Sequence, residues 1–508
     1  MFLVSVRKNK TLVFGLMAIV SFFLTLTCWA VSSPPGASPD DDYHLASSFC
    51  AHGIREGLCQ PSLEATDRLV PAAIVSMQDC YSSQFSSAEC AEKRINNLNG
   101  RMKVTNRVNS TGFYPQLFYF ADGIFANSNL KTFVIVSRLF NIIIVILLFV
   151  MTYRYSNETI RRKIPLTLAV CSIPLGLSIF SSNNPSSWAT TGLLSFALIL
   201  FSVELPLRSK ANFRKIIPLS IAAIAAIGSR PDSAVFLVIV VLGALLHIGS
   251  KFSYREIIRA VGISCLIILP PIWFFTSDAL RSFYKNGFVD GKYNAPGLDV
   301  LNNNIQNLPQ FIFGSFGFSF SEVQTKTGHL GWFNTPVPPL TSMIVFAVFV
   351  IVISKCVANW SRGQRDAVLF FIATFILLSL AIHQIDLSVI GQNVQPRYFQ
   401  LFPFLIFGIS IFNHHKKPFK NFEKILVVVS LTVGQAFALH LLIKRYTVGY
   451  GDFGPSLNRG VKWWGLSPVN PMVVWILATI SFAFFSYSAV SLSNIGLQVD
   501  KPQLEALE

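Results

Sequence analysis

Charged residues are scarce in this sequence. Lys, Arg, Asp and Glu make up 13% of the 508 residues, whereas a soluble globular protein carries about 25%. Hydrophobic residues make up 52%, and the mean hydropathy is +0.52. This composition excludes an ordinary soluble enzyme and indicates an integral membrane protein.

Acidic residues are the scarcer charged class, with 25 Asp and Glu against 41 Lys and Arg, which gives a net charge of +16. Such an excess could attract nucleic acid, but Lys and Arg also accumulate in the cytoplasmic loops of membrane proteins. We therefore expect a lipid bilayer and no nucleic acid as partner. The sequence also has no Walker A motif and no dinucleotide fingerprint, which argues against a nucleotide-driven pump or a cytosolic nucleotide-sugar enzyme.

Long apolar runs predict an all-α integral membrane fold, because a run of about 20 apolar residues spans a bilayer as a helix. Residues 1–30 place Arg7, Lys8 and Lys10 before an apolar stretch, which we interpret as transmembrane helix 1, an uncleaved signal anchor. Eleven further spans bring the predicted total to about twelve transmembrane helices. They are predicted near residues 133–153, 164–181, 190–205, 216–229, 234–250, 260–277, 341–358, 367–385, 398–413, 425–444 and 472–490.

The distribution of basic residues predicts the orientation of these helices. With the N-terminus inside, the Lys- and Arg-rich loops alternate with loops that hold few of them, as the positive-inside rule requires. This topology places both termini, including a tail at 491–508, in the cytoplasm beneath the plasma membrane. Helices 2–7 then occupy residues 133–277 and helices 8–12 occupy 341–490, and the three long extracytoplasmic segments are 31–132, 278–340 and 445–471.

Cysteines agree with this sidedness, because four of the eight fall in the first extracytoplasmic segment: Cys50, Cys59, Cys80 and Cys90. In an oxidising compartment four cysteines can form two disulfides, with three pairings open. A zinc site is the alternative, but the sequence has no Cys-x-x-Cys spacing to support it.

The most suggestive polar cluster is Asp40-Asp41-Asp42-Tyr43-His44, shortly after helix 1. Adjacent carboxylates raise one another's pKa, so one of them could act as a base near neutral pH. Three carboxylates could equally hold a divalent cation. The sequence does not require this cation or any other cofactor. The bland alternative is a solvated acidic turn that follows Pro39.

Other polar groups lie on the same predicted face. Arg397 and Tyr398 open the tenth predicted helix, where an arginine can bind a phosphate through two N–H groups or simply anchor at the membrane surface. Asn184 lies in a polar turn, and Arg230 with Asp232 could form a structural ion pair. Trp332 could stack on a sugar ring or anchor at the interface.

Four motifs follow one another on this face: Asp41-x-x-His44, Ser182-x-Asn184-Pro185, Gly331-Trp332-x-x-Thr335 and Arg397-Tyr398. Their order and sidedness, between about Pro34 and Pro403, resemble an actinobacterial-type family of polytopic membrane proteins. That family is largely uncharacterised and is grouped with the GT-C-fold glycosyltransferases.

The resemblance implies a role for each matching residue. The acidic pair followed by His falls on Asp40, Asp41 and His44, and in GT-C enzymes a carboxylate of the first outer segment deprotonates the acceptor hydroxyl. Asp40 is the first choice for this base. Asp41 stands where Glu is common in the family, and Asp42 is additional, so the choice among the three stays open.

We therefore expect a glycosyltransferase that moves a sugar from a polyprenyl-phosphate donor to an envelope glycan or glycoprotein, with inversion. Asp40 and Asp41 are the catalytic candidates. The substrate-binding candidates are His44, Asn184, Arg230, Asp232, Trp332, Arg397 and Tyr398. The main rival is a transporter or flippase of a lipid-linked glycan, which usually places charged residues inside its helices. A non-catalytic envelope scaffold is the third alternative.

Overall fold

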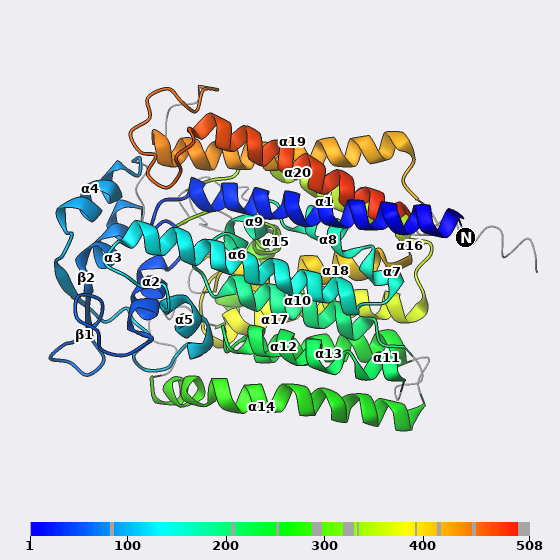
Figure 1. Ribbon diagram of the computed structural model, residues 1–508. Coiled ribbons are helices and arrows are strands. Elements are labelled where there is room, and N and C mark those ends of the chain that lie inside the picture. Colours follow the sequence, from blue (N-terminus) through cyan, green and yellow to red (C-terminus); the bar gives the residue numbers. More distant parts are fainter. Residues whose placement is uncertain are drawn as a thin grey trace, which may run out of the picture.

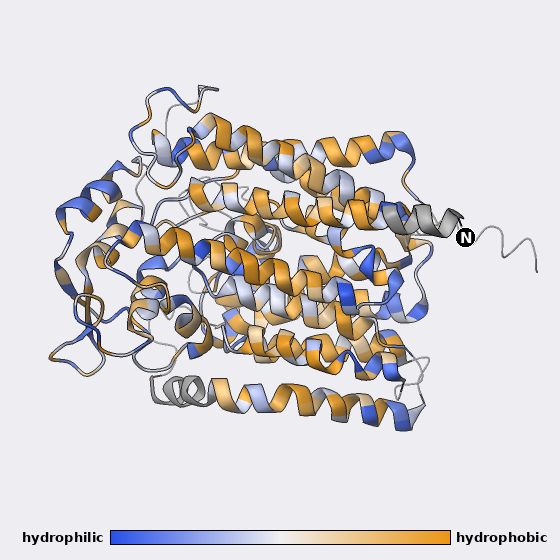
Figure 2. Ribbon diagram, viewed as in Figure 1, coloured by the Kyte–Doolittle hydropathy of each residue, from blue (hydrophilic) through white to orange (hydrophobic). Residues whose placement is uncertain are grey.

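The helices of the computed structural model run side by side as a bundle (Figure 1). The structure describes residues 2–81, 86–204, 209–249, 253–286, 297–318, 330–332, 335–391, 394–413, 418–449 and 454–495. Apolar residues dominate the middle of the bundle, and hydrophilic residues gather at its two ends (Figure 2). This banding is the pattern that a bilayer imposes on a helical protein.

The bundle is built from long and short helices. Its principal members are α1 (Phe2–Ser32), α6 (Leu130–Tyr155), α8 (Ile164–Cys171), α9 (Leu175–Phe180), α10 (Ser186–Phe201), α12 (Ile216–Ile227), α13 (Ser233–Gly249), α14 (Tyr254–Asn286), α15 (Gly297–Gly314), α16 (Pro339–Val357), α17 (Arg362–Ile385), α18 (Leu401–Ser410), α19 (Asn421–Thr447) and α20 (Pro471–Asn494). Short connecting helices are α7 (Glu158–Arg161), α11 (Lys210–Phe213) and the 3-10 turn η2 (Pro396–Phe399).

Seven described helices are long and apolar enough to cross a membrane, namely α1, α6, α14, α16, α17, α19 and α20. A helix also lies in every other predicted span, but these helices are shorter. The predicted span 164–181 is divided into α8 and α9 at Pro174, since proline lacks the N–H that would continue the helical hydrogen bonds. Helix α18 has 10 residues and α12 has 12. The total of twelve spans therefore stays a prediction.

Several helices begin at a side-chain cap. Asn129, Ser361 and Asn470 each accept a hydrogen bond from the backbone N–H three residues ahead, at the starts of α6, α17 and α20. These bonds satisfy N–H groups that have no partner inside the helix. The caps place the helix starts within a few residues of the predicted boundaries.

Residues 33–81 and 86–129 form a folded cap over one end of the bundle, and we call this end the cap end (Figure 1). The cap contains α2 (Asp41–Cys50), β1 (Gln60–Pro61), β2 (Arg68–Pro71), α3 (Ala72–Met77), η1 (Gln78–Cys80), α4 (Glu89–Asn97), β3 (Met102–Thr105) and α5 (Gln116–Gly123). The strands pair antiparallel in the order β1-β2-β3, with Leu69 opposite Gln60 and Val104. The all-α expectation missed this sheet, because strands of two to four residues carry little periodicity.

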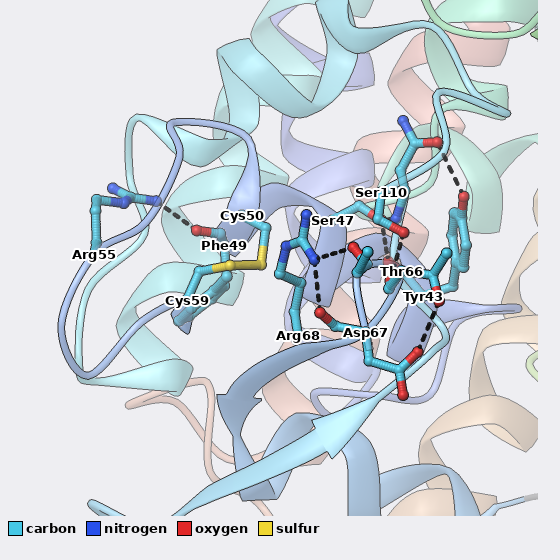
Figure 3. The surroundings of a disulfide bond; sticks show 12 residues. Tyr43, Ser47, Phe49, Cys50, Arg55, Cys59, Thr66, Asp67, Arg68 and Ser110 are labelled. Atoms are coloured by element: carbon cyan, nitrogen blue, oxygen red, sulfur yellow. Dashed lines mark hydrogen bonds between the residues drawn. A yellow bond between two sulfur atoms is a disulfide. The ribbon is translucent and has the colours of Figure 1, made fainter. Parts of the chain in front are cut away.

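Two disulfides stabilise the cap, Cys50–Cys59 and Cys80–Cys90. They are one of the three pairings that the sequence left open. Around the first, the Arg55 guanidinium donates to the carbonyl of Phe49 at 2.7 Å, so that the short loop closes on itself (Figure 3). The disulfide thereby joins the end of α2 to the start of the sheet.

The N-terminus lies at the other end of the bundle (Figure 1). There the Lys163 ammonium donates to the carbonyl of Ser493 at 2.7 Å, and Lys424 lies 3.9 Å from the ring centroid of Tyr487. We call this the basic end. The predicted inner loops at the starts of α8 and α19 thus gather with the end of α20, as the charge pattern requires.

Candidate functional site

The candidate site is built on the turn that joins α1 to α2. Asp40 precedes α2 with φ 58° and ψ 23°, in the left-handed region. Aspartate tolerates this conformation better than most residues. The change of chain direction at Asp40 gives the carboxylates of Asp40, Asp41 and Asp42 three different surroundings.

Asp40 lies between two guanidinium groups. Arg397 of η2 donates to one carboxylate oxygen at 2.8 Å, and Arg107 of the cap approaches the other at 3.3 Å. The Asp40 side chain is 36% exposed and that of Arg397 is 7% exposed. Burial raises the pKa of Asp40, but the charges of Arg397 and Arg107 outweigh burial and hold the pKa below its ordinary value.

Asp41 is completely buried. One oxygen accepts the backbone N–H of Ser38 at 3.0 Å, and the Arg138 guanidinium lies 3.9 Å away. Burial raises the pKa of Asp41 to about 7. Because Asp41 has no exposed surface, the geometry favours Asp40 as the carboxylate that can touch a substrate.

Asp42 shares Arg107 with Asp40. Arg107 donates to Asp42 through two N–H groups, one at 3.1 Å, and only 4% of the Asp42 side chain is exposed. In the part of the chain that the structure describes, no three His, Cys, Asp or Glu side chains gather as a metal site. The three carboxylates, which the sequence offered as one possible cation site, have arginine partners instead: Arg107 contacts Asp40 and Asp42, and Arg138 lies beside Asp41.

Arg138 is a buried residue of the site that the sequence analysis did not select. From α6 it donates to the carbonyl of Ala30 at 2.8 Å, to that of Pro34 at 3.1 Å and to the side chain of Asn183 at 3.1 Å. It therefore joins the end of α1 to the 181–187 turn. An available signal was a basic residue inside an otherwise apolar predicted span.

Asn184 and Trp332 hold the same turn from other elements. The Asn184 amide donates to the carbonyl of Pro39 at 3.0 Å, and the Trp332 indole donates to that of Gly36 at 2.7 Å. Gly36 has φ +79°, and an added Cβ would lie 2.8 Å from the Cβ of Met77. Asn184 and Trp332 thus position the backbone that carries Asp40.

Arg230 and Asp232 form the predicted ion pair, with two N–H···O contacts at 3.0 and 2.9 Å. The Arg230 guanidinium lies 4.4 Å from the ring centroid of Tyr398. The Tyr398 hydroxyl in turn accepts from Arg397 at 3.3 Å. The cation–π contact of Arg230 with Tyr398 connects the α12–α13 turn to η2 and packs against the ring of Tyr398.

His44 is buried among aromatic rings. Its Nδ1 lies 2.8 Å from the Tyr119 hydroxyl, and its ring centroid is 5.6 Å from that of Tyr114. Burial lowers the pKa of His44 to about 3, so the ring is neutral at physiological pH. His44 therefore adds no charge beside Asp40.

A small pocket lies beside Arg397. Its walls come from Pro39, Leu175, Ser178, Ile179, Gly314, Leu330, Gly331, Gln395, Pro396 and Arg397. Its volume is about 20 Å³, roughly the space that one water molecule needs. The pocket combines a guanidinium with largely apolar walls.

Family comparison covers all of these residues. The profile of a family described as predicted membrane protein (DUF2142) matches residues 22–407. The chain belongs to this family. The matched region begins in α1 and ends in α18, so it includes both the cap and Arg397. No curated protein matches the chain.

Two solved structures are similar to the chain, both of ArnT from Cupriavidus metallidurans. The apo state superposes with a TM-score of 0.42 at 12% identity, covering 96% of this chain and 78% of that one. The structure bound to undecaprenyl phosphate gives 0.42 at 11% identity, covering 96% and 77%. What ArnT binds is a property of that protein.

The structure brings the predicted residues together at the cap end, but in different roles. Asp40, Arg397 and Tyr398 form one contact group, and Asn184 and Trp332 hold its backbone. The second residue that the sequence analysis missed is Arg107. Nothing in its local sequence separates it from the other arginines of the cap, since its partners are 65 and 67 residues away.

Proposed function

We propose that this membrane protein is a glycosyltransferase of the GT-C type. It moves a sugar from a polyprenyl-phosphate donor to a cell-envelope glycan or glycoprotein on the extracytoplasmic face. The observation that carries the proposal is the 2.8 Å contact between Arg397 and Asp40, which lie 357 residues apart in the sequence. A cation suited to phosphate and a carboxylate suited to a hydroxyl proton meet at one point.

The reaction assigns one task to each group. The acceptor hydroxyl oxygen attacks the anomeric carbon, and its proton passes to the Asp40 carboxylate. The bond from that carbon to the phosphate oxygen breaks, and its electron pair leaves with the phosphate. Arg397 stabilises the charge that develops there. One direct displacement inverts the anomeric centre.

The pocket walls suit a lipid-linked donor. Leu175, Ile179 and Leu330 lie beside Arg397, so a phosphate on the guanidinium would have apolar surface next to it for its chain. A polyprenyl-phosphate sugar carries its own activation and requires no nucleotide. Because a volume of about 20 Å³ cannot hold a sugar, we expect η2 and α9 to move apart when the donor binds.

The charges of this site favour transfer over transport. Transporters usually bind their substrate near the bilayer midplane. Here Asp40, Arg107 and Arg397 lie in the cap and in the turn before α18, outside the long apolar helices. Transport by a flippase requires neither a base nor a cation that stabilises a leaving group, so it would not use the contact between Asp40 and Arg397.

Sugar transfer to endogenous acceptors tests the proposal, with labelled polyprenyl-phosphate sugars added to membranes that contain the full chain. We expect Asp40→Asn and Arg397→Gln each to lower transfer by about 100-fold or more, as loss of a base or of a charge-stabilising donor does. Asp79→Asn is the control, because it breaks a 2.8 Å ion pair with Arg94 elsewhere in the cap.

Full transfer by folded Asp40→Asn and Arg397→Gln proteins would show that this site is not catalytic. Movement of a lipid-linked glycan across vesicles without any sugar transfer would instead identify a flippase.

A further inference from the structure

The carboxylate of Asp40 bridges two arginines from distant parts of the chain. Arg397 reaches its Oδ2 at 2.8 Å and Arg107 reaches its Oδ1 at 3.3 Å. Two guanidinium groups that converge on the two oxygens of one anion form an anion-binding site, and here a side chain of the protein fills it.

The two arginines are held by different means. Arg107 is 43% exposed but also binds the buried carboxylate of Asp42, and Arg397 is itself only 7% exposed. Asp40 is 36% exposed and immediately precedes α2. If the Asp40 side chain turned away, Arg107 would keep a partner and the two guanidinium groups would still face the same space.

We infer that the phosphate of the donor displaces the Asp40 carboxylate from between Arg107 and Arg397 and so releases Asp40 to act as the base. This inference rests on the proposed function and adds to it how the site is regulated. While it is paired with two cations, a carboxylate is a weak base, because they stabilise its ionised form. Binding of the phosphate removes this stabilisation only when the donor is in place.

The charges of the site favour one class of phosphate. Arg107 and Arg397 carry two positive charges, and Asp42 neutralises one of them. Without Asp40, the net charge of these groups is +1, which matches an anion with a single negative charge. A phosphodiester, such as a sugar linked through phosphate to a lipid, carries one. A monoester carries nearly two at neutral pH, since its second pKa is about 6. The product of transfer is such a monoester, so its charge matches the site less well. Once Asp40 has passed its proton to the leaving phosphate or to water, its carboxylate can compete with the product for the two arginines.

Binding measurements separate this inference from turnover. Calorimetry with the purified full-length protein would use two probes, decaprenyl methyl phosphate, which is a lipid phosphodiester with one negative charge, and inorganic phosphate. Asp40→Asn and Asp40→Gly both remove the competing charge, and both residues accept the left-handed backbone at position 40. We expect each variant to bind the lipid phosphate about fivefold more tightly than the natural protein, as removal of one competing ion pair predicts.

Arg107→Gln and Arg397→Gln should each weaken binding by about tenfold, because each removes one charge-assisted contact. Asp79→Asn and Arg94→Gln are the matched controls, because they break the separate ion pair of the cap. Both should bind like the natural protein. Thermal unfolding of each variant establishes that it is folded.

Tighter binding of both probes, or of the lipid phosphate alone, supports displacement by the donor. Unchanged or weaker lipid binding by both Asp40 variants overturns it, as does tightening for inorganic phosphate only or no binding by any form. If lipid binding tightens but no form transfers sugar, the anion site stands and the proposed function fails. If transfer depends on Asp40 but binding does not tighten, the function stands and the displacement fails.

Discussion

At the scale of single residues, the three adjacent aspartates show how far identical side chains can differ. Asp40 is paired with Arg397 and Arg107, Asp41 is buried against the Ser38 backbone, and Asp42 is bound by Arg107. The run of carboxylates predicts that some acidic group is present. The left-handed backbone at Asp40 and the start of α2 decide which one is accessible.

The burial of Asp41 predicts a dependence of stability on pH. Its pKa is about 7 in the folded protein, against an ordinary value of 3.8. Between these values the folded state holds a proton that the unfolded state has lost, so the free energy of unfolding falls as pH rises from about 4 to about 7. Below this window the contribution is constant, and above it the loss is complete.

Asp41→Asn should remove this part of the pH dependence, because the amide oxygen still accepts the Ser38 N–H but does not titrate. We expect its unfolding temperature in detergent to exceed that of the natural protein more at pH 8 than at pH 5. Asp122, another buried acid of the cap, has a pKa raised to about 6 by burial. Asp122 therefore contributes to the pH dependence of stability that remains in Asp41→Asn. A variant with the same pH dependence as the natural protein would contradict this account.

At the scale of elements, α6 fixes the end of α1 through Arg138. A fully buried guanidinium is tolerated because carbonyls, an amide and a carboxylate surround it. The predicted span gave the position of α6 correctly, but the purpose of its arginine depends on groups that lie 45 to 108 residues away. Hydropathy similarly predicted one span at 164–181 and did not reveal its division into α8 and α9.

Arg138→Gln should loosen the turn that carries Asp40. It leaves backbone carbonyls without their charged donor and Asp41 without the positive charge 3.9 Å away. We therefore expect a loss of about 3 kcal/mol or more in the free energy of unfolding. Limited proteolysis should cut residues 33–40 faster. The free energy of unfolding of Arg138→Lys should lie between those of the natural protein and Arg138→Gln, because one ammonium group cannot replace the planar guanidinium at every acceptor.

Arg154→Gln is the matched control, because Arg154 lies exposed at the other end of the same helix. Equal unfolding temperatures and cleavage rates for Arg138→Gln and Arg154→Gln would show that Arg138 does not hold the turn.

At the scale of the whole molecule, the bundle has a basic end with the N-terminus and a cap end with the disulfides and the candidate site (Figure 1). Lys163 and Lys424 lie with the last turns of α20, as an alternating topology requires. The positive-inside rule then predicts that the cap faces out of the cell.

Single cysteines test this orientation in intact cells. Leu63 in the cap is fully exposed, and the Arg362 side chain at the start of α17 is 83% exposed. We expect a membrane-impermeant maleimide to label Leu63→Cys and to label Arg362→Cys only after the cells are opened. The protein without either change is the control for its native thiols. Labelling of Arg362→Cys alone in intact cells would reverse the topology.

The sequence by itself determined the membrane class, the places of the long helices and the polar residue types at one end. These are local properties, because an apolar run or a basic loop acts on the bilayer wherever the rest of the chain lies. Only the tertiary structure decided which aspartate is accessible, and only it revealed Arg107 and Arg138. Their roles depend on contacts between residues far apart in the chain, above all that of Asp40 with Arg397. Hydropathy and spacing do not record such contacts.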